Sequence, residues 1–213
     1  MGAFYLDILK DRLYTTGRDS DLRRSAQTAM YHVLEELVRW IAPILSFTAE
    51  EIWQLVPGER ADSVFMSTWY EGPPPLGDEP YGAGFWRSAT ALVDRVKEAI
   101  EPRRASKEIR GSLDADVFIM PRSDAGRELL AAFGDELRFL LIVSEATVVD
   151  EGEAPEDAFE TDDYVIWVRP SEAEKCVRCW HRREDVGSNP AHPELCGRCV
   201  ENVDGPGESR RMV

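Results

Sequence analysis

The chain has 213 residues, with 25 Lys and Arg against 40 Asp and Glu, and a formal net charge of −15. This length suffices for one or two modest cores and excludes a large catalytic machine. There is no apolar run of about 18 residues to span a membrane, and no signal peptide at the N-terminus, so we expect a cytoplasmic protein. The acidity would by itself argue against nucleic acid as a partner, because Lys and Arg neutralise the phosphate backbone.

The first quarter of the chain predicts helices. Apolar residues recur at three- and four-residue steps from Leu22 to Ile41, which predicts a long amphipathic helix that Pro43 ends or bends. The segment Thr48–Glu51 has the pattern of a capping box, so we expect a second helix to begin there and to end at Pro57–Gly58.

A Pro- and Gly-rich stretch then separates these helices from the next one. Residues 71 to 84 carry three consecutive prolines and four glycines, a composition typical of a loop or linker. From Phe85 to Ile100 apolar residues return to helical spacing, which predicts another helix ending near Pro102.

The period of the apolar residues changes to two after residue 112. Alternation from Leu113 to Met120 predicts a strand with one buried face. We expect one helical stretch from Asp124 to Leu141, and two further short strands at 146–149 and 164–168. The acidic residues 150–163 between these strands predict an exposed loop. This part of the chain is therefore expected to be a small α/β or α+β module.

The four cysteines carry the strongest chemical signal. They form two C-x-x-C pairs with sixteen residues between them: Cys176, Cys179, Cys196 and Cys199. This spacing is typical of one structural zinc ion whose four thiolate ligands leave no open position for catalysis. Two disulfides or a redox C-x-x-C are the alternatives, but disulfides do not persist in the cytosol and a redox motif needs only one pair. His181 and His192 are alternative ligands.

No catalytic constellation is visible. The three histidines are few and scattered, and the chain has no G-x-S-x-G, H-E-x-x-H, P-loop or G-x-G-x-x-G motif. The sequence therefore predicts a binding role.

Several segments resemble the C-terminal end of bacterial isoleucyl-tRNA synthetase, and together they cover essentially the whole chain. Phe4–Tyr14 is similar to the opening of that family's helical anticodon-binding domain, and Tyr31–Trp53 to its central helices. Cys176–Val203 is similar to its terminal zinc finger. The pattern Ala42–Thr48 also occurs in the related synthetases for valine and leucine, and the zinc finger distinguishes them.

The resemblance implies three modules: a helical anticodon-binding domain at 1–110, a small α/β (α+β) module at 111–170, and a four-cysteine zinc finger at 171–213. The family's H-x-G-H and K-M-S-K-S motifs and its editing domain are absent from this chain. We therefore expect a monomeric part of an isoleucine–tRNA ligase that is inactive alone, whereas the intact enzyme attaches isoleucine to tRNA using ATP. The implied partners are isoleucine tRNA and the rest of the synthetase, with no membrane.

The resemblance also implies which residues contact tRNA. Loop bases stack on aromatic or guanidinium planes, and Lys and Arg bind the phosphates. The candidates in the finger are Trp180, Arg178, Arg182, Arg183 and Arg198. The candidates elsewhere are Lys10, Arg12, Arg23, Arg24, Arg103, Arg104, Lys107 and Arg110. The alternative is that the finger arginines offset the negative charge of the zinc thiolates and that Trp180 packs internally.

Two other functions remain possible from the sequence alone. The finger also resembles the DNA-binding finger of formamidopyrimidine-DNA glycosylases, although those enzymes use an N-terminal proline that this chain lacks. A zinc-stabilised protein adaptor is the other alternative.

The charge is unevenly distributed along the chain. Residues 111–170 hold 4 basic and 15 acidic groups, and the remaining residues hold 21 of the 25 Lys and Arg. We therefore expect the acidic module to face away from the tRNA, with basic residues gathered on the other faces.

Overall fold

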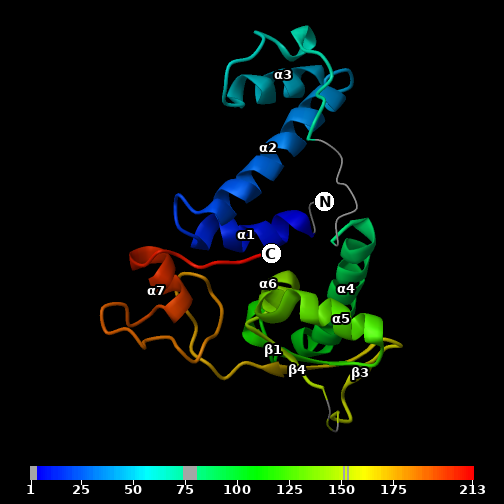
Figure 1. Ribbon diagram of the computed structural model, residues 1–213, viewed down its shortest axis with the longest axis vertical. Helices are drawn as coiled ribbons and strands as arrows, with labels where there is room; N and C mark the ends of the chain where they lie inside the picture. The colour runs from blue at the N-terminus through cyan, green and yellow to red at the C-terminus, as the bar shows by residue number, and fades with distance from the viewer. Residues whose placement is uncertain (1–3, 74–80, 151, 153) are drawn as a thin grey trace.

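The computed structural model describes residues 4–73, 81–150, 152 and 154–213. A helical arm, a sheet covered by helices, and a finger with a C-terminal tail follow one another along the chain (Figure 1). Most of the predicted linker, residues 74–80, lies outside the described residues. Within the described part of the chain, no helix is both long and apolar enough to cross a membrane.

The arm consists of α1 (Tyr5–Thr15), α2 (Asp21–Ile41) and α3 (Ser46–Leu55). The Ser20 hydroxyl oxygen accepts a hydrogen bond from the backbone N–H of Arg23 and so caps α2. α2 ends at Ile41, as predicted from Pro43, and it projects away from the sheet with α3 at its far end (Figure 1).

The predicted capping box at Thr48–Glu51 is wrong. α3 begins at Ser46, two residues earlier, and its N-cap residue Leu45 makes no side-chain cap. The Ser46 hydroxyl donates to the Ala42 carbonyl oxygen at 3.0 Å, and the chain is already helical when it reaches Thr48.

The sheet contains β1 (Ala115–Pro121), β2 (Glu145–Val148), β3 (Phe159–Glu160) and β4 (Tyr164–Pro170), in the order β2-β1-β4-β3. β1 pairs in parallel with β2, whereas the other pairs are antiparallel. Ala115, Val117 and Ile119 are fully buried, which confirms the predicted face. The stretch predicted as a loop at 150–163 contains the short strand β3, because Phe159 and Glu160 pair with β4.

Helices cover one face of the sheet. They are α4 (Ala83–Ala105), α5 (Asp124–Phe133) and α6 (Leu137–Leu141) (Figure 1). The helical stretch predicted over 124–141 is divided into two helices, because Gly134 has a φ of +49° and a short 3₁₀ turn separates α5 from α6. α4 shares one core with the sheet, α5, α6 and Ile8 of α1.

The finger has little regular structure, as predicted, apart from α7 (Gly197–Asp204). The C-terminal tail, residues 205–213, runs back from α7 between α1 and α6 (Figure 1). Both carboxylate oxygens of Glu136 accept backbone N–H groups of the tail, including those of Met212 and Val213 at 2.7 and 2.8 Å. Val213 is buried. The tail is therefore part of the packed structure.

Candidate metal centre and nucleic-acid interface

The four cysteines lie together at the centre of the finger. Their sulfur atoms are all within 4.8 Å of one another, and all four residues are buried. A turn presents the first pair, because the Trp180 N–H donates to the Cys176 carbonyl oxygen at 2.9 Å. Cys196 is the N-cap residue of α7, although its side chain makes no cap hydrogen bond, and Cys199 lies in the first turn, where the helix dipole favours thiolates.

The donor set fits a structural zinc ion. The cysteines are free thiols, and the Cys179 and Cys196 sulfur atoms are 3.7 Å apart, well beyond the ~2.05 Å of a disulfide. Four soft, buried sulfur donors are the ligand set that tetrahedral zinc takes, and they leave no position for a substrate or water.

Neither histidine joins the four cysteines. His192 pairs with Asp204 at 2.6 Å. His181 is buried, and its Nε2 atom lies 3.8 Å from a carboxylate oxygen of Asp11. Burial, together with the nearby Arg198, lowers the pKa of His181 to about 4, so it is neutral at pH 7. Nothing in this geometry supports either residue as a metal ligand.

Arg178 and Arg198 turn inward toward α1. The Arg198 guanidinium donates to both carboxylate oxygens of Asp11, at 2.8 and 3.0 Å. Arg178 donates to the Thr15 carbonyl oxygen at 2.5 Å and lies 3.8 Å from the sulfur of Cys199. These contacts join the finger to α1 and place positive charge beside the cysteine cluster.

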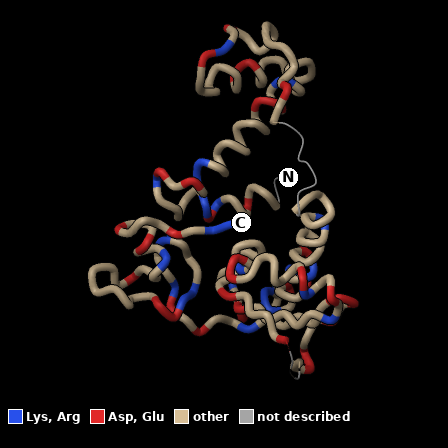
Figure 2. The backbone as a smooth tube through the Cα atoms, viewed as in Figure 1, with Lys and Arg blue, Asp and Glu red and all other residues tan. Residues whose placement is uncertain are grey.

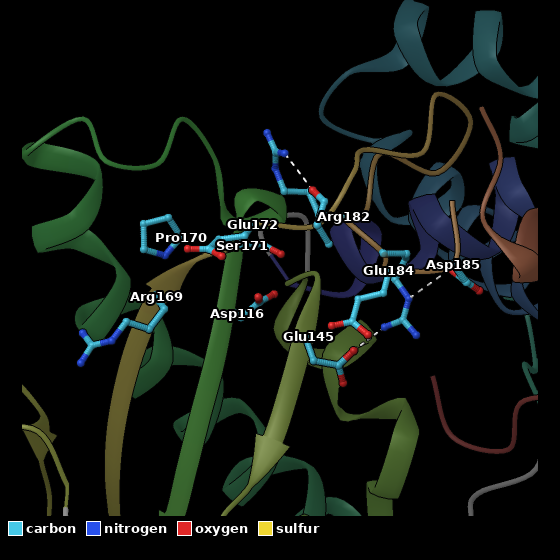
Figure 3. A pocket seen from close by; sticks show the side chains of 11 residues that line it. Asp116, Glu145, Arg169, Pro170, Ser171, Glu172, Arg182, Glu184 and Asp185 are labelled. Atoms are coloured by element: carbon cyan, nitrogen blue, oxygen red, sulfur yellow. Dashed lines mark hydrogen bonds and ion pairs between the residues drawn. The ribbon is translucent and has the colours of Figure 1, made fainter. Parts of the chain in front are cut away.

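Arg182 and Arg183 face a polar cleft between one end of the sheet and the finger (Figure 3). The cleft has a volume of about 840 Å³ and is lined by three arginines and five carboxylates. Arg182 donates to Asp114 at 3.0 Å, and Arg183 pairs with Glu145. Because carboxylates outnumber guanidinium groups, this cleft is unsuited to phosphate.

A second cleft, of about 390 Å³, lies between α1 and the finger, and we call it the α1–finger cleft. Its lining is mostly apolar and brings together three predicted tRNA contacts, Lys10, Arg178 and Trp180. It also contains Tyr14, which sequence reasoning missed, although Tyr14 follows Lys10 by one helical turn and so shares its face. Tyr14 and Trp180 are 74% and 62% exposed.

The other basic candidates do not join this cleft. Arg12 is partly buried on α1, and Arg23 and Arg24 lie in the first turn of α2. At the end of α4, Arg103 pairs with Glu108 and Arg104 lies 3.4 Å from Glu101.

Lys107 and Arg110 are exposed beyond the end of α4. In the finger and the tail, Lys and Arg lie beside Asp and Glu (Figure 2). The prediction that basic residues gather on the faces away from the acidic module is therefore wrong for Arg182, Arg183 and Arg198, which form ion pairs within the chain.

Comparisons with known proteins identify the class. Residues 1–119 match the family described as the anticodon-binding domain of tRNA ligase, and residues 173–202 match the zinc finger found in FPG and IleRS. The chain belongs to the anticodon-binding domain family of tRNA ligases.

Individual relatives narrow this class to one kind of ligase. The chain is 54% identical to the isoleucine–tRNA ligase of Nitrosococcus oceani, 53% to that of Azotobacter vinelandii and 51% to that of Thioalkalivibrio sulfidiphilus. Each match covers 100% of this chain and 23% of the relative, so the chain spans about a quarter of their length. The predicted resemblance and fold class are confirmed, and the DNA glycosylase alternative is not supported.

Proposed function

We propose that this chain binds the anticodon region of isoleucine tRNA as part of an isoleucine–tRNA ligase. The α1–finger cleft is the observation that carries the proposal. It combines two exposed aromatic rings, Tyr14 and Trp180, with the cations Lys10 and Arg178 around one concave apolar surface. Unstacked bases of a tRNA loop bind such surfaces by stacking, while cations hold the neighbouring phosphates.

The zinc ion contributes to this role through structure. When bound, it cross-links the two C-x-x-C pairs and so holds the finger in one conformation. Trp180 directly follows Cys179, and its backbone has a φ of +66°, a strained value for a residue other than glycine. The metal thereby fixes the direction in which Trp180 points.

The proposal assigns the chemistry of aminoacylation to the rest of the ligase. The chain supplies anticodon binding, and the remaining three-quarters of the enzyme joins isoleucine to tRNA using ATP. Such an enzyme works in the cytoplasm, and we expect it to be a monomer.

The arm supplies the contact with the rest of the ligase in this proposal. Large apolar side chains are exposed at its far end, which we call the arm tip: Leu37, Trp40, Ile44, Leu45, Phe47, Leu55, Phe65, Met66 and Trp69. Phe47 is 94% exposed and Ile44 is 80% exposed. A set this large on a protein surface marks an interface. The partner that we propose is the remainder of the ligase chain.

The binding experiment is a titration of labelled tRNA. We expect saturable binding of isoleucine tRNA that weakens with salt and is tighter than binding of valine tRNA. Trp180→Ala should weaken binding by about 1–3 kcal/mol, the contribution of one stacked base. Trp69→Ala, which removes an exposed tryptophan of the arm tip, is the matched control and should leave the affinity unchanged. Equal affinity for duplex DNA, or none for tRNA, would contradict the proposal.

A further inference from the structure

A buried carboxylate of α1 holds the finger and the C-terminal tail at the same point. The carboxylate of Asp11 accepts hydrogen bonds from Arg198 of α7 at 2.8 and 3.0 Å, and it also pairs with Arg210 of the tail. Only 18% of the Asp11 side chain is exposed. Three segments that are distant in the sequence therefore meet at one side chain.

A second carboxylate completes this cluster. Glu208 accepts from Arg198 at 3.3 Å and from Arg210 at 2.8 and 2.9 Å, so two guanidinium groups face two carboxylates. The Arg210 side chain is 2% exposed, and its guanidinium lies 3.7 Å from the centre of the Phe139 ring of α6. Removing one member of such a buried cluster leaves its partners as unpaired charges.

Resting on the proposed function, we infer that Asp11 is a positioning residue for tRNA binding, because it holds the finger against α1 and so keeps both walls of the α1–finger cleft in place. Asp11 itself lines this cleft between Lys10 and Tyr14, which supply one wall. Its partner Arg198 adjoins the cysteine ligand Cys199, so a single residue separates the carboxylate from the metal centre.

The position of the Trp180 side chain depends on this link between Asp11 and Arg198, because few neighbouring side chains hold it. Its side chain is 62% exposed, so the backbone of the finger decides where it lies. Two hydrogen bonds to Thr15, one helical turn beyond Asp11, also join these walls: Arg178 donates to its carbonyl oxygen, and Arg198 donates to its hydroxyl oxygen at 3.3 Å. Without the Asp11 link, the finger would keep its zinc and its fold but would lose its fixed place beside α1.

Removing the Asp11 carboxylate should change the tRNA affinity in opposite directions for a positioning role and for simple charge repulsion. A carboxylate beside an RNA site repels phosphate, so removing it would strengthen binding if Asp11 did nothing else. A positioning role predicts the opposite, a weaker complex. The salt dependence should stay the same, because no phosphate contact is lost.

The test compares Asp11→Asn with Asp7→Asn in the full chain. Asp7 lies on the same helix and lines the same cleft, but its ion pair with Lys10 is exposed. Isoleucine tRNA should bind the Asp11 variant roughly tenfold more weakly, within the range usual for coupled sites, and should bind the Asp7 variant at least as tightly as the wild type. Trp180→Ala should cost less affinity in the Asp11→Asn background than in the wild type, and zinc content should stay at one ion per chain.

The outcomes separate this inference from the proposed function. If the wild type binds tRNA and Asp11→Asn binds as tightly, the inference is overturned and the proposed function stands. If the wild type does not bind tRNA, the proposed function fails. Amide hydrogen exchange then decides the inference: exchange in residues 12–16 and 176–182 should be faster in Asp11→Asn than in Asp7→Asn, and equal rates overturn it. If Asp11→Asn does not fold, Arg198→Gln removes the same two hydrogen bonds from the finger side and should show the same loss.

Discussion

Losing one zinc ligand should unfold the finger and spare α2 and α3. Cys196→Ser removes a donor that is 1% exposed and that directly precedes α7. Apart from the cysteines, the apolar cluster of the finger contains only Val186 and Leu195, both partly buried. Two such side chains contribute at most about 6 kcal/mol, whereas zinc binding contributes about 10–16 kcal/mol in small fingers. The metal therefore stabilises the finger more than its apolar side chains do, and the finger cannot stay folded without it.

Amide hydrogen exchange measures this effect segment by segment. In Cys196→Ser, residues 174–204 should exchange like an unfolded chain, while α2 and α3 keep the protection of the wild type. α1 should lose part of its protection near Asp11 and Thr15, because both residues contact the finger. The matched control is Ser188→Ala at an exposed position of the finger, which should change nothing. Full protection of the finger in Cys196→Ser would refute the claim that the metal holds it together.

Three further predictions concern stability, each measured by urea unfolding. Glu35 is buried between Arg39 and Arg60, at 2.5 and 3.1 Å, so Glu35→Gln should destabilise the arm by about 3 kcal/mol; a loss under about 1 kcal/mol would contradict this. Leu130→Ala in the sheet core should cost about 2–5 kcal/mol, whereas Leu55→Ala at the exposed arm tip should cost almost nothing, and equal losses would contradict the packing. Arg198 and Arg210 outweigh the cost of burial and lower the pKa of Asp11 from 3.8 to about 2. Its contribution of about 2 kcal/mol is present above about pH 4 and is lost as the pH falls toward about 2, so the stability difference between wild type and Asp11→Asn should narrow on acidification; a constant difference would contradict this assignment.

Much of the fold could be predicted from the sequence because its signals are local. The end of α2 shortly before Pro43, the buried face of β1 and the cysteine cluster all follow from spacing within a few residues or from a known ligand pattern. The Thr48 pattern did not predict the start of α3, because the helix begins at Ser46 without a side-chain cap and Thr48 already lies inside it. The apolar residues around Gly134 keep helical spacing, so the sequence pattern does not reveal a break there. In the structure, the positive φ of Gly134 separates α5 from α6.

The candidate site was less predictable, because long-range pairing determines it. The residues next to Arg198 in the sequence predict an exposed cation. In the structure it pairs with Asp11, which lies 187 residues away in the sequence. Arg183 likewise pairs with Glu145, 38 residues earlier. The same pairing brings Tyr14 beside the finger. Three arginines of the finger, Arg182, Arg183 and Arg198, therefore pair with carboxylates that are distant in the sequence, and only the fold reveals these pairs.

Cross-linking of the bound complex tests the central claim most directly. Isoleucine tRNA carrying a photoreactive base in the anticodon loop is bound to the chain and irradiated, and the cross-linked peptides are identified by mass spectrometry. The account predicts cross-links to the segment from Lys10 to Tyr14 and to the segment from Arg178 to His181. Cross-links confined to the sheet or to the arm tip, with none in the α1–finger cleft, would contradict it.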